Sequence, residues 1–158
     1  QFAPYIRTPK TYKCPSDWTM FELRFYTGPD HDYVQMHAPK PRSYSLNWNL
    51  GWVGPQKIAP VGYKNFDEVV KPANVISFID VNPESMCWPF FGIMTNNSFH
   101  MYPSVSHRGA GLIAYSDSHV ARRKWKDIRT FDKKIPWHAH GTKSPNNEDL
   151  LFLQKHAE

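Results

Sequence analysis

The segment from residue 107 to residue 120 constrains the fold of this chain more than any other. Residues 112–116 and 119–125 read as two strands that are separated only by Asp117 and Ser118. Such a short connection predicts an antiparallel hairpin, because parallel strands need a much longer crossover. Asp-Gly would be the ideal turn sequence, since both central positions of that turn favour positive φ. Serine at position 118 is therefore expected to cost some strain or to change the turn type.

Four further segments carry a clear pattern. Residues 43–48 alternate apolar and polar side chains, which is the period of a strand with one buried face. Residues 75–79 form an apolar run interrupted only by Ser77, which predicts a central strand. Residues 65–70 predict a short capped helix, and residues 147–156 predict an amphipathic closing helix. These segments together predict an α+β fold with a small antiparallel sheet of three to four strands, short helices and long loops.

The rest of the chain shows no sustained period. Residues 1–41 are rich in proline and scattered aromatic residues, which predicts a packed, mostly irregular connection. Within it, residues 19–26 read equally as a short strand or as a helical turn. Residues 80–106 predict a long surface excursion, a place where function often concentrates. No internal repeat or linker interrupts the chain, so we expect a single domain over residues 1–158.

The composition narrows the range of partners. The formal net charge of +5 would suit an acidic partner, but most of the excess lies in residues 122–126 with Lys133 and Lys134. Such a run is typical of a solvated strand end, and no helix-turn-helix, zinc-finger or RNA-binding pattern accompanies it. We therefore expect no nucleic-acid partner. No apolar run of about 18 to 20 residues is present, and no signal-peptide pattern opens the chain.

Catalytic motifs are absent from the sequence pattern. Ser116 and Ser118 lie near His119 and Asp117, but adjacent strand residues point to opposite faces and no G-x-S-x-G elbow is present. Glycines at 109 and 111 precede a strand instead of opening a helix, which argues against a phosphate loop. We therefore expect that the protein is not an enzyme.

Histidines and aspartates raise the question of a metal site. His107 and Asp117 bracket a predicted strand, so we expect His107 to anchor a loop by hydrogen bonds and Asp117 to accept backbone N–H bonds in its turn. Calcium candidates are Asp80 and Asp117, but no short run supplies the roughly six to eight oxygens that the ion takes. The other metal candidates are His119, the pair His138 and His140, and the carboxylates Asp127 and Asp132.

Aromatic residues are numerous for a chain of this size. They either fill the core of a loop-rich domain or form an exposed platform for sugar rings or a protein partner. Trp88, Phe90 and Phe91 are the candidates for an exposed surface, because prolines flank them on a predicted loop. The remaining members of the set are Trp48, Trp52, Trp125 and Trp137.

Two cysteines, Cys14 and Cys87, lie far apart and form neither a CxxC pair nor a zinc ligand set. Outside the cytoplasm a bridge between them would close a long loop and stabilise the fold by roughly 4 kcal/mol. Both thiols are also compatible with small buried apolar groups. The sequence leaves these alternatives open.

Five blocks in the same order resemble one family. Residues 107–120 resemble the processing-associated segment of prepilin-like proteins, in which a histidine, nine residues and Asp-Gly precede a final His-Val strand. The matching residues are His107, Gly109, Asp117 and His119, with Ser118 in place of the usual glycine. The other blocks are residues 4–17, 42–47, 72–80 and 145–150. The chain thus resembles the globular head of a type II secretion pseudopilin or type IV pilin-like protein.

The resemblance implies a pilin-like head laid on a long apolar helix that precedes the present residues. It implies a structural subunit of a pseudopilus or pilus-like filament, whose partners are other pilin-like subunits and secretion-system components. It places the protein in the periplasm or at the cell surface, anchored in the inner membrane before assembly. It also implies another possible partner for Cys14 in the missing helix, and it adds a calcium expectation that no run of ligands strengthens.

Two functions follow as expectations. In the first, the chain is a structural subunit of a filament, and an apolar face of its sheet needs a helix to cover it. That face is formed by Tyr44, Leu46, Ile76, Phe78, Leu112 and Ala114, or by their alternates. In the second, the chain is a secreted or surface binding module that holds polysaccharide or a protein through its aromatic loops. An exposed apolar strip on the sheet would favour the first.

Overall fold

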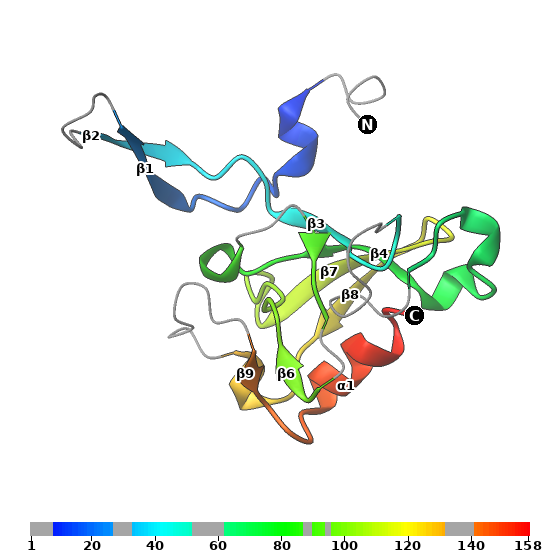
Figure 1. Ribbon diagram of the computed structural model, residues 1–158. Helices are drawn as coiled ribbons and strands as arrows, with labels where there is room; N and C mark the ends of the chain where they lie inside the picture. The colour runs from blue at the N-terminus through cyan, green and yellow to red at the C-terminus, as the bar shows by residue number, and fades with distance from the viewer. Residues whose placement is uncertain (1–7, 27–32, 52–61, 87–89, 94–95, 132–140) are drawn as a thin grey trace. The chain divides into compact units, whose positions relative to one another are not determined.

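A computed structural model of the chain describes residues 8–26, 33–51, 62–86, 90–93, 96–131 and 141–158 (Figure 1). The chain divides into two compact units, Gln1–Ser43 and Tyr44–Glu158. The expectation of a single domain stays a prediction.

The first unit contains a short 3-10 helix and a β-hairpin. The helix, η1 (Pro9–Tyr12), starts with proline, and the Thr8 side chain accepts a bond from the Lys10 N–H at its N-terminus. Strands β1 (Met20–Tyr26) and β2 (Tyr33–Pro39) pair in antiparallel register from Met20 opposite Pro39 to Tyr26 opposite Tyr33. The prediction of a mostly irregular connection over residues 1–41 is therefore wrong. The reason is that the strand at 20–26 is completed by a partner whose own pattern is too weak to recognise alone.

The second unit is built around a five-stranded sheet of order β5-β3-β4-β7-β8. All neighbours are antiparallel except β3 and β5, which are parallel. The sheet is thus mixed and larger than the antiparallel sheet of three to four strands that the sequence predicts, although the α+β class is confirmed. Its strands are β3 (Tyr44–Asn47), β4 (Ile76–Asp80), β5 (Phe90–Phe91), β7 (Ala110–Tyr115) and β8 (Val120–Lys124).

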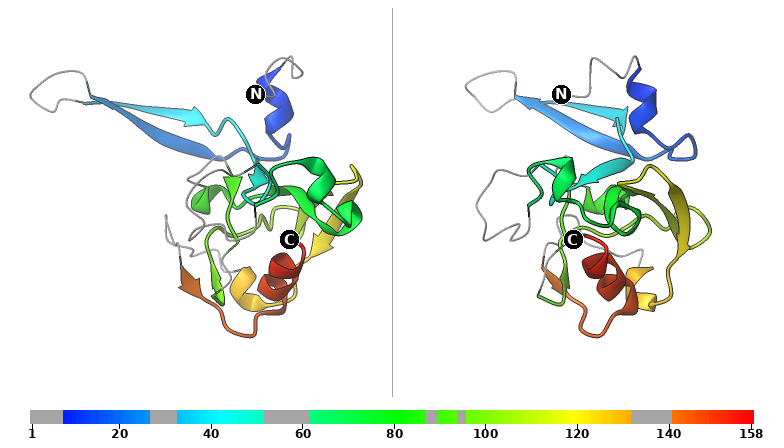
Figure 2. Two further views of the ribbon diagram at one scale, coloured as in Figure 1. Left: turned by 45° about the vertical axis from the view of Figure 1, so that its right-hand side comes forward. Right: turned by 90° about the vertical axis from the view of Figure 1, so that its right-hand side faces the viewer.

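Short elements connect and close this sheet (Figure 2). The predicted helix at 65–70 is a single 3-10 turn, η2, and the predicted closing helix is α1. A second small sheet pairs β6 with β9. The bounds are η2 (Phe66–Glu68), η3 (Pro72–Asn74), η4 (Pro83–Ser85), β6 (Ser98–Phe99), η5 (Ile128–Thr130), β9 (Thr142–Lys143) and α1 (Glu148–Lys155).

A β-bulge in β4 decides which of its residues enter the core. Ile76 lies opposite Tyr115 and Ile79 lies opposite Ile113, with a register shift between Ile76 and Phe78. A bulge adds one residue to one strand, so two positions three apart face the same side. Ile76 and Ile79 are both fully buried as a result. Ile76 therefore does not share the face of Phe78, contrary to the predicted set.

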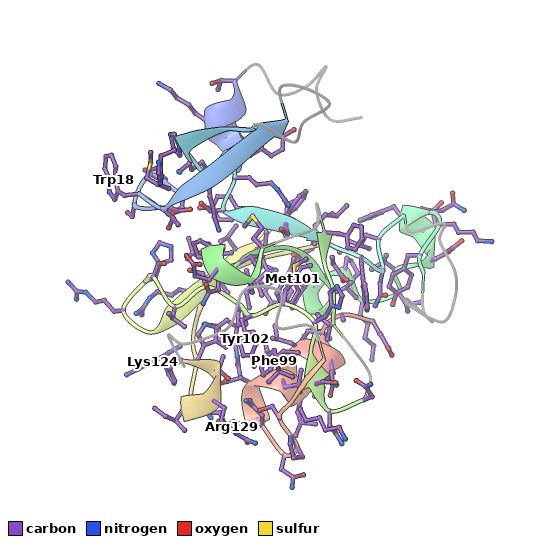
Figure 3. All side chains as sticks on the ribbon, turned by 60° about the vertical axis from the view of Figure 1, so that its left-hand side comes forward. Trp18, Phe99, Met101, Tyr102, Lys124 and Arg129 are labelled. Atoms are coloured by element: carbon purple, nitrogen blue, oxygen red, sulfur yellow. The ribbon has the colours of Figure 1, made fainter. Side chains whose placement is uncertain are left out.

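The described residues between 80 and 106 place their large apolar side chains in the core, so the predicted surface excursion is wrong for them. Phe91, Phe99 and Met101 are each at most 1% exposed and pack in one cluster with Ile79 and Ile113. Figure 3 shows Phe99, Met101 and Tyr102 gathered inside the unit, where the rings of Phe99 and Tyr102 stack at 4.4 Å between centroids. Proline and asparagine made the segment look exposed, but its apolar residues cover one face of the sheet.

Helix α1 closes the same face. The Asn147 side chain caps it by accepting bonds from the N–H groups of Asp149 and Leu150. Leu150 and Leu153 are buried in the core cluster, whereas Leu151 is half exposed. The amphipathic helix predicted at 147–156 is confirmed, and its cap is an addition from the structure.

Candidate functional site

The sheet of the second unit carries an apolar stripe on the face that points away from the core cluster. Leu46, Phe78, Ala114 and Val120 lie side by side across four strands. Val120 is 65% exposed and the other three are half-buried. Tyr44 and Leu112 lie two residues along the same strands and are also half-buried. We call this set the outer stripe: Tyr44, Leu46, Phe78, Leu112, Ala114 and Val120.

Basic residues border the outer stripe on β8. Arg122 and Lys124 follow Val120 at the two-residue spacing of one strand face, and both are exposed. The guanidinium of Arg122 donates a hydrogen bond of 2.9 Å to the carbonyl oxygen of His107. The stripe is therefore apolar at its centre and positively charged along its β8 edge.

The motif histidine lies in the turn that leads into β7. Arg108 and Gly109 both have positive φ, 58° and 74°, and the Gly109 N–H donates to the carbonyl oxygen of Val105. A Cβ at position 109 would come within 2.9 Å of the Phe131 ring, so glycine is needed for backbone angle and for space. The Trp125 N–H donates to the Gly109 carbonyl, which ties this turn to the end of β8.

The His107 ring faces a buried carboxylate. Its Nε2 lies 3.2 Å from Oδ2 of Asp80, whose side chain is only 3% exposed. Asp80 ends β4, and its carbonyl oxygen accepts a bond from the Ser104 N–H. His107 therefore anchors its loop against β4, as predicted. Asp80 lies in this pair, while Asp117 lies in an exposed turn beyond the other end of β7, so the two calcium candidates are not brought together.

Metal ligands do not converge elsewhere in the described ranges. Among the residues the structure describes, no three His, Cys, Asp or Glu side chains come together in a way that would hold a metal ion. His138, His140 and Asp132 lie outside these residues. Asp127 uses its carboxylate to bind the Arg129 side chain and the Arg129 N–H, so it too has a structural partner.

The turn between β7 and β8 differs from the predicted two-residue turn. The Tyr115 N–H donates to the carbonyl oxygen of His119, and the Ser118 N–H donates to the carbonyl oxygen of Tyr115. The loop between Tyr115 and His119 therefore has three residues. Only Ser118 has positive φ, at 78°. This is the three-residue hairpin in which the last loop residue adopts the left-handed conformation, and that residue is usually glycine. The two-residue turn is therefore wrong. Of the two expectations for Ser118, strain or a changed turn type, the structure shows a positive φ together with a different turn type.

Asp117 acts as the predicted turn residue. Its Oδ1 accepts a bond from the His119 N–H and lies 2.6 Å from the His119 Nδ1. The backbone N–H of His119 is the main cause that holds the pKa of Asp117 below its usual value. The His119 ring in turn stacks on Tyr115 at 4.3 Å between centroids. The two ends of the motif, His107 and Asp117, thus fix the two ends of β7 by structural contacts.

Replacing Ser118 with glycine is expected to stabilise the second unit by a few tenths to about 1 kcal/mol, because glycine adopts positive φ without steric cost. Urea denaturation would measure it. Ser116→Gly is the matched control, since Ser116 lies in the same loop without positive φ and should lose about 0.5–1 kcal/mol instead. A destabilised Ser118→Gly variant would contradict the observed backbone angle at 118.

The aromatic candidates do not form an exposed platform in the described residues. Phe91 is 1% exposed, so the prediction that it is a surface residue is wrong; its side chain belongs to the core cluster. Phe90 is half-buried, with its ring centroid 6.5 Å from that of Trp48. Trp88 lies outside the described residues, as do Trp52 and Trp137.

The disulfide prediction also falls partly outside the described residues. Cys14 is buried, and its N–H donates a 3.1 Å bond to Oγ of Ser43. Cys87 lies outside the described residues, so the pairing stays a prediction. Among the described residues, no helix has the length and apolarity to cross a membrane.

A groove in the first unit was missed by sequence reasoning. It has a volume of about 520 Å³ and is walled by Trp18, Met20 and three prolines, Pro15, Pro39 and Pro41. Lys10, Lys13, Cys14, Asp17 and Lys40 complete its lining. The β1–β2 hairpin brings residues 10–20 and 39–41 together, because Met20 lies opposite Pro39. The only signal in the sequence was the recurrence of proline and lysine in those two segments.

The acid at the end of this groove is already satisfied. Oδ2 of Asp17 accepts a 2.6 Å bond from the Ser43 hydroxyl, and its Oδ1 accepts a 2.9 Å bond from the Thr19 N–H. Burial acts to raise the pKa of Asp17, but these hydrogen bonds outweigh it and hold the pKa below its usual value. Asp17 is therefore ionised at neutral pH and engaged within its own unit.

Comparison with known proteins gives no further guide. No family model, no curated protein and no solved structure matches this chain. Its function therefore has to be inferred from the sequence pattern and from the geometry of the described residues.

Proposed function

We propose that this chain is the globular head of a structural subunit in a type II secretion pseudopilus or type IV pilus-like filament. The observation that carries the proposal is the outer stripe. Four of its apolar residues, Leu46, Phe78, Ala114 and Val120, lie in register across four strands, and such a face is suited to packing against another apolar element. The pilin-like resemblance supplies that element, a long apolar helix ahead of the head. The order of the five sequence blocks is the second support.

The arrangement of the sheet supports this use of the stripe. One face is already occupied by α1 and by residues 90–93 and 96–102, which contribute Phe91, Met101 and Leu153 to the core cluster. The opposite face keeps its apolar residues half-buried and Val120 mostly exposed. Covering such a surface gains roughly 25 cal/mol for each Å² removed from water. The packing of a helix there would make the head part of a filament without any change in its core.

The motif residues also favour a structural role over catalysis. His107 and Asp117 make contacts that hold the turns at the two ends of β7, and Arg122 ties the first of these turns to β8. No cofactor is part of this proposal, and partners would be other pilin-like subunits and secretion-system components. In this reading the protein works in the periplasm or at the cell surface.

The alternative, a surface module that holds polysaccharide through aromatic loops, loses part of its support. Phe91 is in the core, and Phe90 is half-buried beside Trp48. A polysaccharide-binding function would need an aromatic surface elsewhere in the protein. The outer stripe, made mainly of aliphatic side chains, is better suited to a helix than to sugar hydroxyls.

Val120→Glu in the full-length protein is expected to reduce filament assembly by about tenfold or more, because it places a charge on the most exposed apolar residue of the stripe, at its β8 edge. Sheared filaments would be quantified from the native host, and the melting temperature of the purified head would be measured in parallel. Val120 is exposed in the head, so the fold itself should be little affected.

Ile128→Glu is the matched control, since Ile128 is a 79% exposed β-branched residue in η5 and not in the outer stripe. It should leave assembly unchanged. If Val120→Glu assembles as well as Ile128→Glu, the outer stripe is not a packing surface and the proposed function loses its main support.

A further inference from the structure

The groove of the first unit combines exposed apolar surface with positive charge. Trp18 is 85% exposed and Met20 is 51% exposed, and Figure 3 shows Trp18 projecting away from its ribbon. Lys10 also lines the groove, and its ammonium makes no hydrogen bond or ion pair with the described residues. The one carboxylate in the lining, Asp17, is engaged by Ser43 and Thr19. The groove therefore lacks an anion that could neutralise a basic rim.

The chain carries a surface of the complementary kind around η2. Phe66 is 65% exposed and Val70 is 86% exposed, and the acidic residues Asp67 and Glu68 lie between them. We call residues 66–70 the acidic knob. Its conformation is fixed locally, because Val69 is buried and the Glu68 carboxylate accepts bonds from the Lys64 N–H at 2.8 Å and from the Asn65 side chain at 3.2 Å.

The charge of the knob is well defined. The Lys64 N–H is the main cause that holds the pKa of Glu68 below its usual value, so this carboxylate is ionised at neutral pH. Asp67 makes no hydrogen bond or ion pair with the described residues. Two exposed apolar side chains thus flank two carboxylates, one of which is without a partner. The groove has the complementary composition: its exposed Trp18 and Met20 accompany Lys10, whose ammonium has no partner among the described residues.

We propose that the groove of one copy of this chain receives the acidic knob of a second copy. Phe66 and Val70 would pack against Trp18 and the prolines, while Asp67 would meet Lys10. Such a contact would bury the large apolar side chains that each surface alone leaves in water. A sugar is a poorer occupant, because the proline, methionine and tryptophan walls would leave its hydroxyls unpaired.

The contact joins two different patches, so it is head-to-tail. Such a heterologous contact repeats from copy to copy and gives an open chain unless the rotation closes it into a ring. The inference rests on the proposed function, because a filament places identical heads next to one another along its length. It deepens that function by naming which surfaces of adjacent heads meet.

Zero-length carbodiimide crosslinking of the 158-residue chain tests the contact directly. This reagent joins an amine and a carboxylate only where they are in contact, so a peptide linking Lys10 to Asp67 or Glu68 is the expected product. Mixing ¹⁴N- and ¹⁵N-labelled chains in equal amounts shows whether the link joins two copies. Mixed-isotope linked peptides support the proposal, and linked peptides with a single isotope composition would place both groups in one chain and overturn it.

Variants supply the second readout. Trp18→Ala and Lys10→Glu should each lower the yield of crosslinked dimer about tenfold, as expected for an interface anchor and a reversed charge. Lys10→Glu combined with Asp67→Lys should recover most of the wild-type yield, because the pair is restored with opposite signs. Unchanged yield in Trp18→Ala, or no recovery in the double variant, would contradict the contact.

Direction and independence are tested by mixing. A Trp18→Ala chain still offers its knob, and a Phe66→Ala chain still offers its groove, so together they should form a 1:1 dimer that grows no further in sedimentation velocity. The Val120→Glu variant serves as a control that should crosslink normally, since the outer stripe is not involved. Loss of crosslinks with intact filaments would reject only this contact, and intact crosslinks without filaments would reject only the filament function.

Discussion

Trp125→Ala is expected to lower the free energy of unfolding of the second unit by about 3–5 kcal/mol, the largest single-site loss that we predict for an apolar residue. Trp125 is 1% exposed, follows directly after β8 and belongs to the core cluster with Ile113 and Leu153. Removing the indole would leave a cavity between the sheet and the residues of α1 that share the core cluster, Leu150 and Leu153. A small shift of the neighbouring side chains would therefore not fill the cavity.

The indole is also held by polar and steric contacts. Its Nε1–H donates a 2.8 Å bond to the Ser104 carbonyl, and its ring lies so close to Gly111 that a Cβ there would come within 3.0 Å of it. Gly111 in the middle of a strand is thus explained by the ring that packs over its backbone. Loss of the indole would leave the buried Ser104 carbonyl without its donor, which adds to the cavity cost.

Urea denaturation followed by far-ultraviolet circular dichroism would measure the change. Trp125→Phe keeps most of the packing and should lose less, because it removes chiefly the Nε1–H bond. Ile128→Ala, three residues along the chain at a 79% exposed position, should change the free energy of unfolding by less than about 0.5 kcal/mol. A Trp125→Ala variant as stable as Ile128→Ala would mean that this ring does not hold the sheet.

Local patterns were sufficient for the elements whose signals are complete within a few residues. The alternation at 43–48, the apolar run at 75–79 and the amphipathic pattern at 147–156 all correspond to elements of the structure. Each depends on a period or a cap that the segment itself contains. The turn at Asp117 and Ser118 was predicted in the same way, although positive φ was expected at both positions and only Ser118 has it.

Elements that depend on distant partners were not predictable. Strand β5 exists because two residues, Phe90 and Phe91, pair in parallel with Leu46 and Asn47, more than forty residues earlier. The 80–106 segment has the composition of a loop, yet some of its polar groups are bonded inside the unit; for example, the buried Ser85 hydroxyl accepts a bond from the Tyr102 N–H. Only the recurring Phe91, Ile93, Phe99 and Met101 hinted that it is core.

The candidate surfaces show the same division. The outer stripe was nearly predicted, because a period-two pattern names one face of each strand, but the bulge at Ile76–Phe78 moved Ile76 to the other side. The groove of the first unit needed the β1–β2 register, which joins residue 20 to residue 39. A sequence pattern names the members of a face, and only the pairing of strands shows which faces meet.

Asp149→Ala is expected to destabilise the second unit by about 3–5 kcal/mol, because it removes a buried carboxylate with several partners. Asp149 is fully buried, and its Oδ2 accepts bonds of 2.8 Å and 2.9 Å from the N–H groups of Lys126 and Asp127. Its Oδ1 lies 3.7 Å from a guanidinium nitrogen of Arg123. The side chain therefore joins the first turn of α1 to the chain that follows β8.

The neighbouring acid provides the comparison that isolates this effect. Glu148 also lies in the first turn of α1, but its side chain is 54% exposed and its 3.1 Å ion pair with Lys126 is on the surface. Exposed pairs contribute at most about 1 kcal/mol, so Glu148→Ala should lose no more than that. Both variants remove one negative charge near the helix N-terminus, so the helix dipole affects them alike.

The difference between the two variants therefore measures burial and hydrogen bonding, and urea denaturation at low and high salt would determine it. The loss in Asp149→Ala should persist at high salt, because the buried bonds are screened little, whereas the small loss in Glu148→Ala should fade. Asp149→Asn should lie between them, since the amide oxygen still accepts bonds from the two N–H groups while the attraction to Arg123 is gone. Equal losses in Asp149→Ala and Glu148→Ala would show that α1 is held by its leucines alone, and that the carboxylate contributes no more than a surface charge.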